Sequence, residues 1–216
     1  MSVRRLAEHQ PDSFAFTPEN EERCAEILKK YPEGRAASAV IAFLWIAQKQ
    51  NDFWLPKLAI ETVAKKLGMP FIRVLEIATF YTMFNLSPVG RFHVQLCGTP
   101  PCFLAGSDAL KDILKKRIGE TGTVTADGLF SWVEVECLGA CCNAPMVQIN
   151  EDYYEDLTPQ NFTALLDDLA AGRPVQIGSQ QGRATSEPAG GLTSLTNLYG
   201  ADGRSGPLSL PGRQQP

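Results

Sequence analysis

Two short cysteine motifs constrain this chain more than any other feature. The first is Cys97-Gly-Thr-Pro-Pro-Cys102 and the second is Cys137-Leu-Gly-Ala-Cys141. Each begins where a predicted strand ends, and glycine or proline in or beside it leaves backbone N–H groups free of regular structure. Thiolates that converge from rigid strand ends, with free amides directed at sulfur, suit a soft metal. These four cysteines are therefore the candidates for a metal site.

The spacing of the motifs leaves three interpretations open and favours the first. Cys-x4-Cys occurs in plant-type [2Fe–2S] proteins, and four thiolates are the complement for one such cluster. Zinc sites usually have about two to four residues between paired cysteines, so zinc is not excluded. The cysteines could also be buried without any ligand. A dithiol oxidoreductase is disfavoured, because the chain has no Cys-x-x-Cys motif.

The composition excludes several classes of function. The net charge of −4 gives no basic surface for nucleic acid. The most apolar stretch, residues 36–47, is too short to span a bilayer, so we expect no membrane insertion. The first ten residues contain no apolar segment, so we expect no secretory signal and a reducing compartment. In such a compartment, six cysteines indicate metal or redox chemistry more than disulfides.

Residues 12–86 are predicted to form a bundle of four helices. Thr17-Pro18-Glu19 is a typical helix start, with a hydroxyl cap, proline in the first turn and an acid near the positive end. The next two helices are expected at about 36–50 and 56–67, the latter ending at Gly68. The fourth begins near Pro70. Cys24 lies on the apolar face of the first helix and is expected to be a small buried hydrophobe.

Residues 87–171 change to a mixed pattern of strands and helices. Apolar alternation predicts strands at 91–96 and 132–136, and a hairpin is expected at 146–155 around Asn150-Glu151-Asp152. Helices are predicted at 108–119 and after Thr158-Pro159. This order is that of a small thioredoxin-like sandwich. The whole chain is therefore predicted to be α+β.

Residues 172–216 form an irregular tail. They hold nine of the 18 glycines and five of the 15 prolines but few large apolar residues. Such a segment cannot build a core of its own. We expect it to be disordered or to lie along a partner.

Several segments outside the cysteine motifs are also distinctive. They are YPEGR at 31–35, ATFYTMF at 78–84, NAPMVQI at 143–149, YYEDL at 153–157 and EPAGGLTSL at 187–195. With the two motifs, they make the chain similar to the 24 kDa [2Fe–2S] subunits of respiratory NADH:quinone oxidoreductase (complex I). The similarity runs from about residue 12 to about residue 198.

This resemblance implies a helical bundle followed by a thioredoxin-like domain with one [2Fe–2S] cluster. Its ligands would be Cys97, Cys102, Cys137 and Cys141. This chain departs from the family at Cys142, where the family often has an aliphatic residue. Cys142 is expected to pack near the cluster without binding it. The cluster would exchange single electrons with the FMN of a partner subunit.

The same resemblance implies where the remaining chemistry lies. FMN and NADH would be bound by the larger partner subunit, because this chain has no Gly-x-Gly-x-x-Gly motif and no phosphate loop. No catalytic residue is expected on this chain, since neither His9 nor His93 belongs to an apparent acid–base motif. Further partners would be the other iron–sulfur subunits of the peripheral arm. The expected location is the cytoplasmic side of the bacterial inner membrane, or the matrix side in a mitochondrion.

Two other functions remain as alternatives. A diaphorase subunit of an NAD-reducing hydrogenase or formate dehydrogenase shares the bundle and the cysteine motifs, although the segment 187–195 favours the respiratory enzyme. A structural zinc domain of an interaction protein is the other alternative. Iron with acid-labile sulfide and visible absorbance would distinguish a cluster from zinc.

Overall fold

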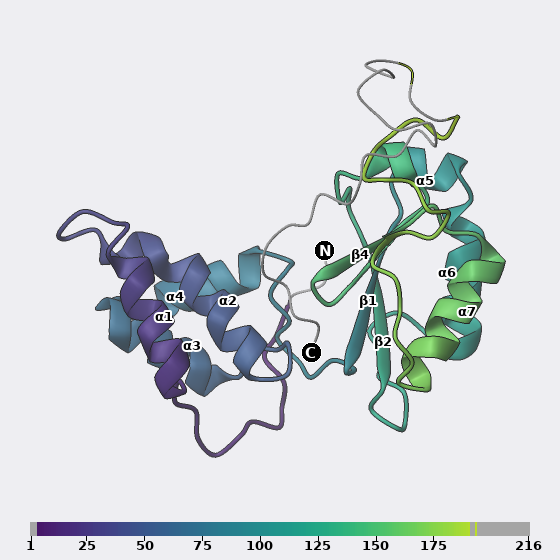
Figure 1. Cartoon of the computed structure of the whole chain (residues 1–216). Coiled ribbons are helices and arrows are strands. Elements are labelled where there is room, and N and C mark those ends of the chain that lie inside the picture. The colour runs from purple at the N-terminus through teal and green to yellow at the C-terminus, as the bar shows by residue number, and fades with distance from the viewer. Residues whose placement is uncertain (1–3, 191–192, 194–216) are drawn as a thin grey trace. The chain divides into compact units, whose positions relative to one another are not determined.

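The computed structural model describes residues 4–190 and residue 193, and it divides into two compact units. One unit comprises residues up to 93 with 124–131, and the other comprises 94–123 with residues from 132 onward. The elements are the helices α1 (Pro18–Leu28), α2 (Val40–Gln50), α3 (Lys57–Leu67), α4 (Phe71–Phe80), α5 (Pro100–Leu104), α6 (Ser107–Arg117) and α7 (Pro159–Ala170), and the strands β1 (Phe92–Cys97), β2 (Phe130–Val135), β3 (Val147–Ile149), β4 (Asp152–Glu155) and β5 (Gly178–Ser179) (Figure 1). These elements confirm the predicted α+β class.

Helices α1 to α4 form the bundle of the first unit. The side chain of Thr17 accepts a hydrogen bond from the backbone N–H of Asn20, which begins α1 as predicted. Gly68 ends α3 in the left-handed conformation, at φ 63°. Cys24 is 2% exposed in the core of this unit, so its prediction as a buried hydrophobe is confirmed. The largest buried side chains of this core are Phe43, Leu44, Leu55, Ile60 and Phe84.

The five strands form one mixed sheet in the order β2-β1-β3-β4-β5. Strands β1 and β3 are antiparallel, with Gln95 opposite Gln148. Strands β3 and β4 form the predicted hairpin, whose turn contains Asn150 at φ 54°. Strand β5 pairs with β4 in parallel. This last strand was not predicted, because it has only two residues and lies within the irregular region.

Helices α6 and α7 lie next to each other on one face of the sheet (Figure 1). Arg117 of α6 donates to Asp167 of α7 at 2.6 Å. A capping box between Thr158 and Asn161 begins α7. Trp132, 1% exposed, donates its indole N–H to the carbonyl of Gly119 at 2.8 Å. The buried indole N–H therefore has its hydrogen-bond partner in the loop just after α6.

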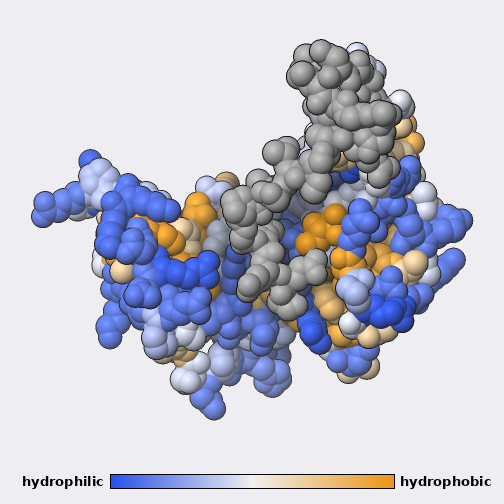
Figure 2. Space-filling model, viewed as in Figure 1, coloured by the Kyte–Doolittle hydropathy of each residue, from blue (hydrophilic) through white to orange (hydrophobic). Residues whose placement is uncertain are grey.

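The surface is mostly hydrophilic, with apolar patches on each unit (Figure 2). Among the residues that the structure describes, the large apolar side chains exposed to solvent are Ile72, Phe80, Tyr81, Phe103, Leu104 and Ile177. Every helix in the described ranges is too short or too polar to cross a bilayer, and the longest, α7, has 12 residues.

His93 is a buried titratable side chain where β1 adjoins β2. It is 7% exposed, and its Nδ1 lies 2.8 Å from the Oγ of Ser131. The same oxygen accepts a hydrogen bond from the N–H of Gly90 at 2.9 Å, so its own proton is free to point at Nδ1. Burial lowers the pKa of the imidazole from 6.5 to about 4. The native state therefore keeps His93 neutral.

This burial predicts a pH-dependent stability. Between pH 6.5 and pH 4 the unfolded chain binds a proton at His93 that the folded chain excludes, so the free energy of unfolding falls as the pH falls. The loss attributable to His93 between pH 7 and pH 5 is about 2 kcal/mol. Urea unfolding of wild type and His93→Gln at both pH values measures it as a difference between the two proteins. The exposed His9, replaced by Gln, is the control, and an equal pH dependence in wild type and His93→Gln would contradict the prediction.

Candidate functional site

All four cysteines of the two motifs lie in the second unit, where β1 and β2 end. Cys97 is the last residue of β1, and Cys102 lies in the short helix α5. The N–H of Gly98 donates to the carbonyl of Val135 at 3.2 Å, so the two strand ends lie side by side. Cys137 follows two residues after β2, and Cys141 begins a 3₁₀ turn at Cys141–Asn143.

Cys97 and Cys102 form a buried pair. Each is 1% exposed, and both pack against Met146. Burial by itself would raise the pKa of Cys97, but hydrogen bonds from Thr99 and from the backbone of Leu138 outweigh it and place this pKa below its ordinary value. Burial, together with the adjacent Cys97, raises the pKa of Cys102 to about 12. This pocket therefore favours negative charge on the sulfur of Cys97.

Cys137 and Cys141 form an exposed pair. Their sulfur atoms are 3.6 Å apart. Two thiolates on one tetrahedral metal, with bonds of about 2.3 Å, are about 3.8 Å apart, so this separation suits a shared ion. Gly139 between them has φ 81°, and its N–H donates to the sulfur of Cys137 at 3.3 Å. A left-handed residue is needed for this turn, which explains glycine at that position.

Hydrogen-bond donors surround the sulfur atoms. The backbone N–H groups of Thr99 and Leu138 reach the sulfur of Cys97, and that of Met146 reaches Cys102. The hydroxyl of Thr99 lies 3.3 Å from the sulfur of Cys97. Such donors stabilise thiolates and are one of the means by which a protein tunes an iron–sulfur centre.

The structure thus brings the predicted cysteines together as two pairs. Cys141 is close enough to Cys97 and Cys102 for their charges to interact, so the pairs are neighbours. Within residues 4–190, no three His, Cys, Asp or Glu side chains are gathered around a position for one metal ion. A donor set of two thiolate pairs, with amides at sulfur, fits a cluster of two irons in which each iron takes two thiolates.

Residues outside the two cysteine motifs also support this site, and the motifs themselves do not indicate them. Met146 fills the space behind the buried pair. Tyr153 donates its hydroxyl proton to the carbonyl of Leu138 at 2.8 Å and so holds the loop between Cys137 and Cys141. The sequence predicts that Tyr153 lies on a strand. It does not predict that the Tyr153 hydroxyl reaches the carbonyl of Leu138, because the two residues are 15 positions apart. Cys142 is exposed and lies outside both close pairs.

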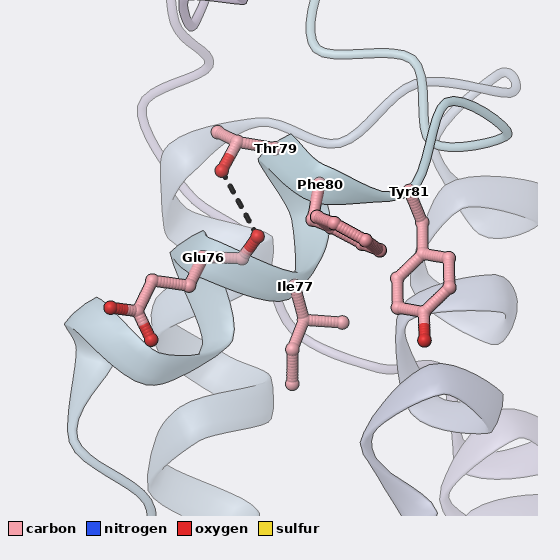
Figure 3. A pocket seen from close by; sticks show the side chains of 5 residues that line it. All are labelled: Glu76, Ile77, Thr79, Phe80 and Tyr81. Carbon is pink, nitrogen blue, oxygen red and sulfur yellow. Dashed lines mark hydrogen bonds between the residues drawn. The ribbon is translucent and has the colours of Figure 1, made fainter.

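A second feature of the surface is a hollow of about 440 Å³ at the end of α4 (Figure 3). Its lining is Glu76, Ile77, Thr79, Phe80 and Tyr81. The rings of Phe80 and Tyr81 meet edge to face, with centroids 5.0 Å apart. Phe80 is 77% exposed. The hollow is mostly apolar, and its polar side chains are engaged within α4, Glu76 with Arg73 and Thr79 with backbone carbonyls, so it offers a contact surface.

Comparison with known proteins identifies relatives at more than half identity. An NADH-quinone oxidoreductase subunit of Rhizobium meliloti (strain 1021) is 54% identical over 90% of this chain and 73% of its own length. The corresponding NADH-quinone oxidoreductase subunit of Rickettsia bellii (strain RML369-C) is 52% identical over 73% of this chain and 95% of its own.

A solved structure and a family model complete the comparison. The NAD+-reducing [NiFe]-hydrogenase in its H2-reduced state has a similar fold, with a TM-score of 0.55 at 23% identity, over 63% of this chain and 23% of the hydrogenase chain. The model of the thioredoxin-like [2Fe–2S] ferredoxin family matches residues 24–170. This match and the relatives at more than half identity show that the chain belongs to the thioredoxin-like [2Fe–2S] ferredoxin family.

Proposed function

We propose that this chain is the electron-transfer subunit of an NADH-quinone oxidoreductase and holds one [2Fe–2S] cluster. The observation that carries the proposal is the pairing of four thiols at one edge of the sheet, with backbone N–H groups directed at sulfur. The 54% identity to the Rhizobium meliloti subunit supports the assignment to this complex. No residue of this chain is assigned a catalytic role.

The four cysteines are the proposed ligands. Cys97 and Cys102 would hold one iron, and Cys137 and Cys141 would hold the other, since these are the pairs whose sulfurs are neighbours. When bound, such a cluster takes up or releases one electron at a time.

The protein gives the two pairs different surroundings. Burial of Cys97 and Cys102 excludes water from one side of the site, and the amides of Thr99 and Leu138 offset the negative charge there. Cys137 and Cys141 lie at the surface. The exposed pair therefore marks the edge at which an electron donor can approach.

The relatives are named as subunits, so this chain works as part of a larger complex. The proposed direct partner is the subunit that binds NADH and FMN, because this sequence carries no dinucleotide-binding motif. Other iron–sulfur subunits of the peripheral arm are the further partners. The proposed location is the cytoplasmic side of a bacterial inner membrane, or the matrix side of a mitochondrial one.

A diaphorase subunit of an NAD-reducing hydrogenase is the second candidate. Its support is the fold shared with such a hydrogenase in the air-oxidised state, at a TM-score of 0.54 and 25% identity. The much higher identity to NADH-quinone oxidoreductase subunits favours the respiratory enzyme. Purification of the native complex distinguishes the two, because only the hydrogenase contains nickel.

The neighbouring cysteines Cys141 and Cys142 provide a test of the proposed ligands, because only Cys141 is proposed to bind the cluster. We expect Cys141→Ser to lower the iron and acid-labile sulfide content or to change the g values of the dithionite-reduced cluster in EPR, because it removes one thiolate. Cys142→Ser is the matched control and should retain the wild-type spectrum. A normal spectrum in Cys141→Ser, or loss of the cluster in Cys142→Ser, would refute this ligand assignment. Zinc in place of iron in the unchanged protein would refute the cluster.

The route of the electron has its own test. We expect NADH to leave the visible absorbance of the isolated chain unchanged and to bleach it once the flavin-binding subunit is added. Dithionite should bleach it in both cases. Reduction by NADH without the partner would mean that this chain binds the nucleotide itself and would contradict the proposed division of labour.

A further inference from the structure

Residues 178–187 follow the thioredoxin-like domain in sequence and are fastened to the end of β4. Strand β5 pairs with Tyr154 and Glu155. The N–H of Gln180 then donates to the carbonyl of Glu155 at 2.9 Å. The beginning of the irregular tail is therefore attached to the domain of this chain itself.

A buried ion pair secures this attachment. Asp156, directly after β4, is 7% exposed and accepts hydrogen bonds from the hydroxyl of Ser179 at 2.5 Å and from Nε of Arg183 at 2.9 Å. A second guanidinium nitrogen of Arg183 also donates to this carboxylate. These bonds hold the pKa of Asp156 below its usual value although burial alone would raise it. The forked contact is the strong form of an arginine–carboxylate pair.

The same guanidinium reaches the loop that carries Cys141. It donates to the carbonyl of Cys142 at 2.9 Å and, on its other side, to the carbonyl of Glu187 at 2.9 Å. Arg183 thus links the carboxylate of Asp156, at the end of β4, to the backbone of the tail and of the cysteine loop.

Asn143 makes a second connection between the same pieces. It is 2% exposed, and its amide donates to the side chain of Glu155 and to the carbonyl of Thr185, both at 2.7 Å. The N–H of Asp156 donates to the carbonyl of Asn143 at 2.8 Å. The residues after Cys141 are therefore anchored from two directions.

We propose that Arg183 is a positioning residue for the second cysteine pair: it fixes the Cys141–Asn143 turn and so holds the sulfur of Cys141 beside that of Cys137. This inference rests on the proposed role of these cysteines as ligands. We define the anchor as Asp156, Ser179 and Arg183. The anchor acts on the cysteine pair through the backbone of Cys142.

Tyr153 holds the loop at Leu138 and Asn143 is held after it, and the anchor adds a restraint at Cys142, directly beside Cys141. Cys137 and Cys141 are exposed, and Gly139 between them allows many backbone conformations. Ordering each such residue opposes cluster binding through lost conformational entropy. A bond from a largely buried guanidinium to the carbonyl of Cys142 removes part of that freedom before the cluster arrives.

The test compares Arg183→Gln with wild-type holoprotein. Loss of the forked contact frees the turn, so we expect iron to be released to a chelator about tenfold faster, measured as loss of visible absorbance. The g values of the reduced cluster should shift or broaden in EPR. Amide hydrogen exchange in a peptide covering residues 137–143 should accelerate, and the far-UV circular dichroism should stay unchanged.

Three further variants isolate the anchor. Arg183→Lys retains the charge but not the fork, so it should restore part of the wild-type behaviour. Ser179→Ala removes one hydrogen bond to Asp156 and should act in the same direction more weakly, which keeps the test open if Arg183→Gln does not fold. Arg173 is the control, because its guanidinium pairs with Asp168 of α7, away from the cysteine loop. Arg173→Gln should match wild type.

The outcomes separate this inference from the proposed function. Wild-type iron release, EPR and hydrogen exchange in Arg183→Gln, even with a lower melting temperature, would overturn the positioning role. An equal effect of Arg173→Gln would also overturn it. If the cluster assignment is wrong, the wild-type protein itself would show no visible absorbance from a cluster and no EPR signal after reduction. Hydrogen exchange at residues 137–143 would then still report whether Arg183 holds the turn.

Discussion

Negative charge on sulfur has to be met by hydrogen-bond donors wherever it is removed from water, and this requirement organises the second unit. Cys97 and Cys102 are buried, so their charge depends on the amides of Thr99, Leu138 and Met146. Those amides are available because two strands end there and because proline and glycine interrupt regular pairing. The sheet, the hairpin and α5 can be understood as the framework that delivers these donors to one edge.

The same edge is asymmetric. One pair of thiols is enclosed by Met146 and neighbouring side chains, whereas the other lies on a glycine-containing loop at the surface. An enclosed pair favours retention of iron, and a surface pair favours exchange of electrons with another protein. The exposed loop has fewer packing contacts to hold its conformation, however. The ion pair of Asp156 and Arg183 restrains it through the hydrogen bond from Arg183 to the carbonyl of Cys142. Stability and access are thus assigned to different halves of one site.

Most of the local structure could be predicted from the sequence, because its signals are local. The cap at Thr17, the stop at Gly68 and the hairpin around Asn150 depend on residues a few positions apart. The meeting of the two cysteine motifs followed from their places at predicted strand ends. Helix α5 was missed because Pro-Pro after a strand also indicates a turn, and five residues carry no helical period.

Long-range polar contacts had no such signal. Asp156 and Arg183 are 27 positions apart, and each looks like an ordinary surface charge until the fold buries them together. The dependence of the cysteine loop on this later segment has a consequence for biosynthesis. A chain is made from its N-terminus, so the ribosome delivers both thiol pairs before the arginine that steadies one of them. In a protein arranged in this way, the loop that carries Cys141 gains its full set of contacts only after the segment that carries Arg183 has also emerged.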